Sequence, residues 1–147
     1  MKPERAAPCF LALGGIFLML MGLYFAFIRP PLLPEDLRYI DTSAIRLQAE
    51  MPRLLSWLAR VFDVLGGYIF ATGLLTLHVA ITGLRGGRPL PRTAVAASGL
   101  ASIGCMAIVN FLLDSDYKWL LLAMTLPWLI ALLPPRIFAG TASGPAP

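Results

Sequence analysis

One run of sequence decides the fold: Val61–Leu84, VFDVLGGYIFATGLLTLHVAITGL. It is long enough to cross a bilayer as a helix, since about 20 apolar residues span the hydrocarbon core. It follows an amphipathic, arginine-spaced segment that begins at Arg46. It also contains Asp63 and His78, which a lipid-facing helix should not show. We therefore expect a membrane-spanning helix with two polar residues that need partners.

The composition indicates a membrane protein of one domain. Of its 147 residues, 58% are hydrophobic and 14% are charged, whereas soluble domains are about half apolar and about a quarter charged. The mean hydropathy is +0.75. The net charge of +4 is modest and no run alternates basic and aromatic residues, so we expect no nucleic-acid binding. The expected partner of this surface is the lipid bilayer.

Four apolar runs predict an all-α fold, an integral membrane four-helix bundle. Their bounds are 9–28, 61–84, 93–113 and 119–133. A signal peptide is the alternative for the first run, but Arg29-Pro30-Pro31 stands where a small-residue cleavage site is expected. The third run is dense in small residues, which suit close helix packing. Pro127 lies inside the fourth run and should kink it.

The longest hydrophilic connection is 29–60. Its early prolines stop the first helix, and Pro34-Glu35-Asp36 can start one short helical turn. A second short helix is expected over 44–50, with Asp41, Thr42 or Ser43 as its cap. Pro52 breaks or restarts that helix, because proline is not tolerated in a helix interior.

The same connection carries an amphipathic pattern. Arg46, Arg53 and Arg60 recur at a spacing that puts them on one helical face, and Trp57 adds a ring that favours the membrane interface. This pattern predicts an interfacial helix that lies in the headgroup plane of the first extracytoplasmic loop.

The basic residues predict the orientation in the membrane. With four spans, one side holds the segments 1–8, 85–92 and 134–147, which carry Lys2, Arg5, Arg85, Arg88, Arg92 and Arg136. The other side holds 29–60 and the short acidic loop 114–118. The positive-inside rule then places both termini in the cytoplasm, with a disordered tail at the end of the chain. Ten arginines against two lysines suggest a GC-rich bacterial genome, so we expect a bacterial inner-membrane protein.

Asp63 and His78 fall on one stripe of the second span. Because lipid offers polar groups no partner, we expect this stripe to face the bundle. Gly67 and Ala71 would permit a close approach, with the third span as the natural neighbour.

Each of the two polar residues has two interpretations. Asp63 is expected to pair with Arg60 or Arg29 near the end of its helix, and the alternative is a proton relay. His78 is expected to be neutral and bonded to a hydroxyl or a backbone carbonyl, and the alternative is an axial ligand of a haem. It is the only histidine, so we expect no metal site and no cofactor.

A polar pocket is a further candidate site at the outer ends of the helices. Asp63, Asn110, Asp114 and Asp116 could line it beneath the loop that carries Arg60. Carboxylate and amide oxygens can hold a cation, and the same group could engage a polar headgroup.

Patterns for catalysis are missing from the sequence. It has no Cys-x-x-Cys, no His-Glu-x-x-His, no Gly-x-Ser-x-Gly and no phosphate-binding glycine loop. Cys9 and Cys105 are expected to be unpaired packing residues.

Two segments carry a family resemblance. LLPEDLRYID follows the first span and GGYIFATGLL lies in the second, and the layout resembles small uncharacterised four-span bacterial membrane proteins. The resemblance implies a four-helix membrane fold and no activity. The first span lacks the buried glutamate of small proton-coupled multidrug exporters, which argues against that family.

The leading hypothesis is therefore a non-enzymatic partner or scaffold protein that joins a homo-oligomer or another membrane protein. The alternatives are a small transporter or channel that uses Asp63 and His78, and an accessory subunit of a quinone- or haem-linked oxidoreductase.

Overall fold

The structure is a computed structural model that describes residues 3–86 and 90–134. Every regular element within these ranges is a helix, which confirms the all-α prediction. Three helices are long and apolar enough to cross a membrane: Ala6–Phe27, Leu54–Arg85 and Arg92–Leu112. The predicted disordered tail falls almost wholly outside the described residues, as do Lys2, Arg88 and Arg136.

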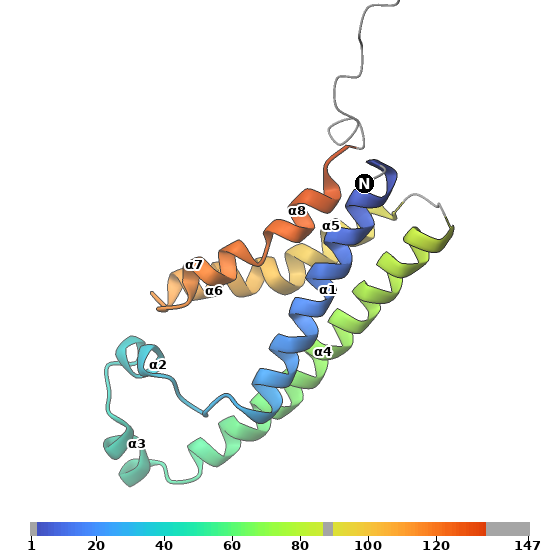
Figure 1. Cartoon of the computed structure of the whole chain (residues 1–147). Helices are drawn as coiled ribbons and strands as arrows, with labels where there is room; N and C mark the ends of the chain where they lie inside the picture. Colours follow the sequence, from blue (N-terminus) through green and yellow to red (C-terminus); the bar gives the residue numbers. More distant parts are fainter. Residues whose placement is uncertain (1–2, 87–89, 135–147) are drawn as a thin grey trace, which may run out of the picture.

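The first two long helices form an antiparallel pair, the N-terminal helix pair (Figure 1). These are α1 (Pro3–Phe27) and α4 (Leu54–Gly86). Helix α1 begins ahead of the predicted apolar run and ends just before Arg29-Pro30-Pro31, where the missing N–H groups prevent continuation.

Glycines let the backbones of α1 and α4 approach closely. Gly15 of α1 faces Gly73 of α4, and Gly22 of α1 faces Gly66 of α4. Within each helix the two glycines are seven residues apart. A Cβ atom at Gly22 would lie 2.5 Å from the backbone nitrogen of Phe70 and 2.7 Å from the carbonyl oxygen of Gly66. This small-residue face therefore fixes how the two helices pack.

The prediction that the Asp63–His78 stripe faces the bundle is wrong. His78 and Ala71 are exposed, and a Cβ atom at Gly67 would meet no atom within 4 Å. The adjacent face of α4, with its glycines, packs against α1 and not against the third span. The physical reason is that close backbone contact over several turns outweighs the local polarity of one stripe, and Asp63 finds its partner on its own helix.

The third span is one helical run with a local irregularity. It consists of α5 (Arg92–Gly99), a π-helical turn η1 (Leu100–Gly104) and α6 (Cys105–Leu112). Each hydrogen bond of a π-helical turn spans one residue more than in an α-helix, so the turn changes which side chains share a face.

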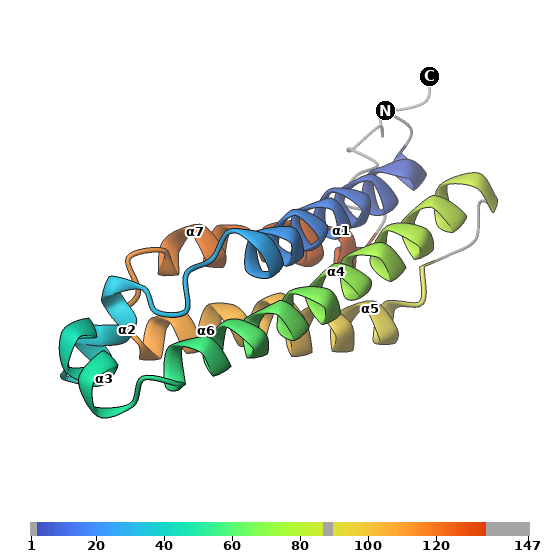
Figure 2. The same ribbon diagram turned by 90° about the horizontal axis from the view of Figure 1, so that it is seen from below.

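The fourth apolar run is broken into α7 (Lys118–Ala123) and α8 (Leu126–Leu132). The break directly precedes Pro127, which occupies the first turn of α8, where its missing N–H costs nothing. The predicted kink is thus a full interruption of the helix. Helices α7 and α8 run back along α5 and α6 and form the C-terminal helix pair with them (Figures 1 and 2).

Trp128 joins the two helix pairs. Its side chain is 3% exposed, and a Cβ atom at Gly14 of α1 or at Gly99 of α5 would overlap its ring. Leu11, Leu18 and other apolar side chains complete the core around it. The pairs are therefore held together at the end where α1 begins and α8 ends (Figure 1).

The connection between α1 and α4 lies at the opposite end of the molecule. It contains α2 (Pro34–Tyr39) and α3 (Ala44–Glu50), and the Ser43 hydroxyl accepts a hydrogen bond from the Arg46 backbone as its cap. Helix α3 ends before Pro52, and α4 begins at Leu54. Arg46, Arg53 and Arg60 therefore do not share a face of one continuous helix.

The outer surface of the helices is apolar. Large hydrophobic side chains are exposed along all three long helices, among them Leu20, Leu23, Leu65, Leu75, Leu100, Ile108 and Leu112. Water would penalise such a surface, whereas lipid would not. Helix length and surface chemistry together support a membrane location.

Candidate functional site

A partly open cavity of about 810 Å³ lies between the two helix pairs. Both pairs line it, with Met21 from α1, Ile69 from α4, Met106 from α6 and Leu120 from α7, and Glu35 of α2 lines it as well. Its volume is within the range of about 300 to 1,000 Å³ that is typical of small-molecule sites. Most of its lining is apolar, and its charged residues come from the start of the α1–α4 connection.

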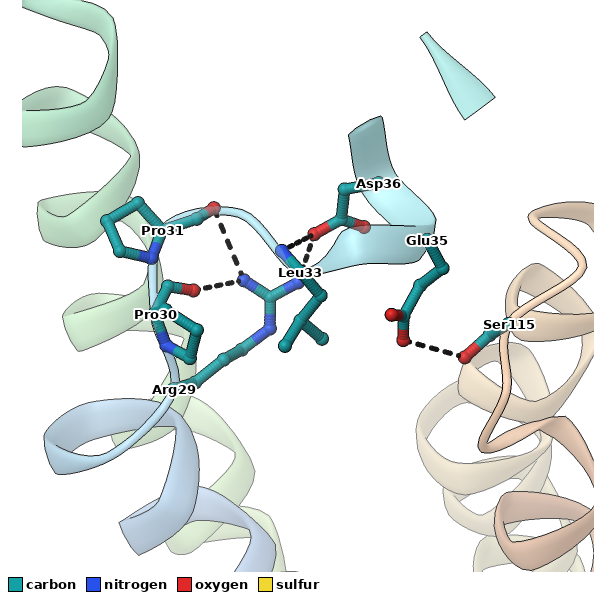
Figure 3. A network of polar contacts seen from close by, with 7 residues as sticks. All are labelled: Arg29, Pro30, Pro31, Leu33, Glu35, Asp36 and Ser115. Atoms are coloured by element: carbon teal, nitrogen blue, oxygen red, sulfur yellow. Dashed lines mark hydrogen bonds and ion pairs between the residues drawn. The ribbon is translucent and has the colours of Figure 1, made fainter. Parts of the chain in front are cut away.

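Arg29 organises the polar end of the cavity (Figure 3). Its side chain is 8% exposed and forms an ion pair of 3.0 Å with Asp36. The guanidinium also donates to the carbonyl oxygens of Pro30, at 3.0 Å, and Pro31, at 3.4 Å. Its central carbon lies 3.8 Å from the ring centroid of Phe62, so the cation is stacked on an aromatic face.

Asp36 links this cluster to the backbone of the connection. The Asp36 carboxylate oxygen that accepts the hydrogen bond from Arg29 also accepts one of 2.8 Å from the backbone N–H of Leu33. Because the prolines turn the chain back after α1, Arg29 and Asp36 come together although they are far apart along an extended chain. The pair therefore fixes α2 over the cavity.

Glu35 is the most buried charged residue of the site. It is 3% exposed, and its carboxylate accepts a hydrogen bond of 3.2 Å from the hydroxyl of Ser115, which is 1% exposed. The Ser115 hydroxyl in turn accepts from the backbone N–H of Tyr117 at 3.2 Å. Figure 3 shows the Glu35 carboxylate directed at Ser115, while Asp36 meets the guanidinium of Arg29. Among the ion pairs of the described residues, none includes Glu35.

No sequence motif identifies Glu35 or Arg29 as site residues. Locally, Glu35 and Asp36 are acids at the start of a short helix. The contact that buries Glu35 joins residues 80 positions apart. No local pattern could reveal it, although a loop carboxylate beside three prolines was a signal of a constrained position.

The predicted outer pocket does not form as one cluster. Asp63 pairs with Arg60 at 2.8 Å, and Asp116 pairs with Arg38 at 2.8 Å. Asn110 lines the cavity, but its side chain donates to the backbone carbonyl of Met106. Within residues 3–86 and 90–134, no group of three histidine, cysteine or acidic side chains is placed to hold a metal ion.

Asp114 is the remaining member of that predicted set. The hydrogen bond from Lys118, together with the charge of that lysine, holds the pKa of the Asp114 carboxyl below its ordinary value. The residue is in the loop between α6 and α7 and has a φ of 49°, the left-handed region in which aspartate is tolerated. Asp114 therefore belongs to the turn between α6 and α7 and pairs with Lys118 there, not with the other residues of the predicted pocket.

His78 and the cysteines lie apart from the polar end of the cavity. His78 is exposed on α4, and the predicted hydrogen bond from its side chain to a hydroxyl or a backbone carbonyl is not formed among the described residues. Cys9 and Cys105 are both free and both exposed, so the prediction that they are packing residues is wrong. Cys105 lines the apolar part of the cavity.

Comparisons with known proteins give no relative. A scan against protein-family models and searches of curated proteins and of solved structures find no match to this chain.

Proposed function

We propose that this chain is a multi-pass membrane protein that binds a single-chain amphiphile in the cavity between its helix pairs. One observation carries the proposal: a cavity of about 810 Å³ with an apolar body ends in a buried polar cluster. An alkyl chain matches the apolar body, and a polar headgroup matches the cluster. The role is non-enzymatic, as the missing catalytic motifs suggest.

The same proposal includes a four-span bundle in a bacterial inner membrane. Helices α7 and α8 together run alongside α5 and α6 (Figure 1), and this supports a fourth, interrupted span. The start of α1 and the end of α8 lie at one end of the molecule, as do Arg85 and Arg92. The positive-inside rule then supports cytoplasmic termini, with α2 and the cavity's polar end on the outer side.

The geometry favours this function over transport through Asp63 and His78. Neither residue lines the cavity; His78 is exposed, and Asp63 is half-buried and paired with Arg60 of its own helix. A route that used both would have to follow the outer surface of a single helix, where lipid surrounds it.

Blocking the cavity should abolish binding of the amphiphile. Ala101 lines the cavity from the π-helical turn, and Ala101→Phe places a ring in it. We expect the affinity for dodecanol, added to delipidated protein in detergent and measured by native mass spectrometry, to fall at least tenfold, which is about 1.4 kcal/mol.

The matched control is Ala97→Phe, which makes the same change on an exposed position of α5 outside the cavity. It should bind dodecanol like the wild type. Equal binding by the wild type and by Ala101→Phe, with both folded, would exclude the cavity as the site.

A further inference from the structure

The polar end of the cavity carries a net negative charge. The charged residues that line it are Arg29, Glu35 and Asp36, one positive and two negative. Arg29 and Asp36 neutralise each other across 3.0 Å. The charge of Glu35 is left over.

Burial makes this leftover charge chemically significant. An ionised carboxylate taken out of water is stable only with a counter-charge or several hydrogen bonds. Glu35 is 3% exposed, and the hydrogen bond that its side chain forms within the described residues comes from Ser115. A carboxylate has about four acceptor positions, so most of its capacity is free for a donor that enters the cavity.

The neighbouring cations of the chain are already committed. Arg29 is held by Asp36 and two carbonyl oxygens, and Arg38 pairs with Asp116. Lys118 pairs with Asp114. These three cations are engaged elsewhere, and a cationic ligand would supply the counter-charge that Glu35 lacks among the described residues.

Two tyrosines add to the preference for a cation. Tyr24 and Tyr117 both line the cavity. The backbone of Tyr24 accepts from the backbone N–H of Arg29, and the backbone of Tyr117 donates to Ser115, so both residues belong to the polar end. Faces of aromatic rings attract ammonium groups.

We infer that the cavity selects an amphiphile with a cationic amine headgroup, and that the carboxylate of Glu35 is the counter-ion of this amine. The inference rests on the proposed function, because it names the headgroup of the molecule that the cavity holds. The alkyl chain would lie among the apolar side chains of both helix pairs, and the ammonium group would donate to Glu35.

The test compares three probes of equal chain length by native mass spectrometry of the delipidated full chain in a neutral detergent. Wild-type protein should bind dodecylamine at least tenfold more tightly than dodecanol, and dodecyl phosphate more weakly than either. This comparison needs no mutation, so it stands even where a variant fails to fold. Dodecylamine that binds no better than dodecanol would overturn the inference.

A variant then assigns the selectivity to one side chain. Glu35→Gln keeps the shape and removes the charge, and it should weaken dodecylamine binding by about 10- to 100-fold while dodecanol binding stays unchanged. Glu50→Gln is the matched control, because Glu50 is exposed on α3 and pairs with Arg46. It should bind all three probes like the wild type.

The variants also separate this inference from the proposed function. If Glu35→Gln binds dodecylamine like the wild type but Ala101→Phe does not, the cavity holds amphiphiles without selecting the amine, and only the present inference fails. If neither variant changes the binding of any probe, the proposed function fails as well.

Discussion

Replacing Gly66 by leucine should prevent α1 and α4 from packing closely and should cause a large loss of stability. A Cβ atom at this position would lie 2.6 Å from the backbone nitrogen of Ala26 and 2.7 Å from the carbonyl oxygen of Gly22. These are backbone atoms, which cannot turn aside as a flexible side chain can. Overpacking costs about 1 to 3 kcal/mol even where side chains can adjust. We expect a decrease of about 3 kcal/mol or more in the free energy of unfolding, measured by titration with dodecyl sulfate in mixed micelles.

Gly67 provides the control on the next residue of the same helix. A side chain there would enter open space on the outer face of α4. Gly67→Leu gains the same helix propensity and apolar surface, so it should be neutral or slightly stabilising. Equal destabilisation by the two substitutions would contradict the close packing of α1 on α4 through this face.

Removing the buried guanidinium should release α2 from the end of α1. Arg29→Ala deletes the ion pair with Asp36, the contacts with two carbonyl oxygens and the stacking on Phe62. It also leaves the Asp36 carboxylate without its cation in a largely buried position. Breaking a buried pair in this way costs about 3 to 5 kcal/mol. We expect a loss of this order in the unfolding titration, together with faster trypsin cleavage after Arg38 in α2.

Two comparisons isolate the effect. Arg60→Ala removes an exposed ion pair with Asp63 and should cost no more than about 1 kcal/mol. In a double-mutant cycle, Arg29→Ala combined with Asp36→Ala should cost less than the sum of the single changes, by at least about 1 kcal/mol. If the losses add, or if Arg29→Ala costs no more than Arg60→Ala, the pair does not anchor α2.

The long elements could be predicted from the sequence because they depend on local properties. The apolar runs give the three long helices, and the prolines after Arg29 and at Pro52 and Pro127 mark the interruptions. The observed ends of the helices differ from the predicted ones where a helix extends beyond its apolar run. Helix α4, for example, begins at Leu54, whereas the predicted span begins at Val61. An apolar run indicates which part of a helix suits lipid, whereas the length of the helix depends on its backbone hydrogen bonds.

The packing face of α4 could have been predicted, but from a different signal. Polarity pointed to the stripe of Asp63 and His78, of which His78 is exposed and Asp63 is half-buried. The equal spacing of Gly15 with Gly22 and of Gly66 with Gly73 was visible in the sequence and identifies the face that packs. Small residues are a stronger guide than polar ones where a polar residue can find a partner on its own helix.

The polar end of the cavity could not be predicted in the same way. Glu35 is buried because the loop after α6 carries Ser115 up to α2, and this depends on how the two helix pairs meet. The break before Pro127 and the position of Trp128 between Gly14 and Gly99 contribute to that arrangement. Long-range geometry of this kind leaves no periodic pattern in the sequence.

Photocrosslinking would test the occupied cavity most directly. An alkyl alcohol with a diazirine at mid-chain would be added to the protein in phosphatidylcholine nanodiscs, irradiated and mapped by mass spectrometry. We expect adducts to concentrate on cavity residues such as Met21, Met106 and Met124 and to disappear in Ala101→Phe. Adducts spread over outward-facing residues such as Leu75 and Leu100, with no change in that variant, would contradict binding between the helix pairs.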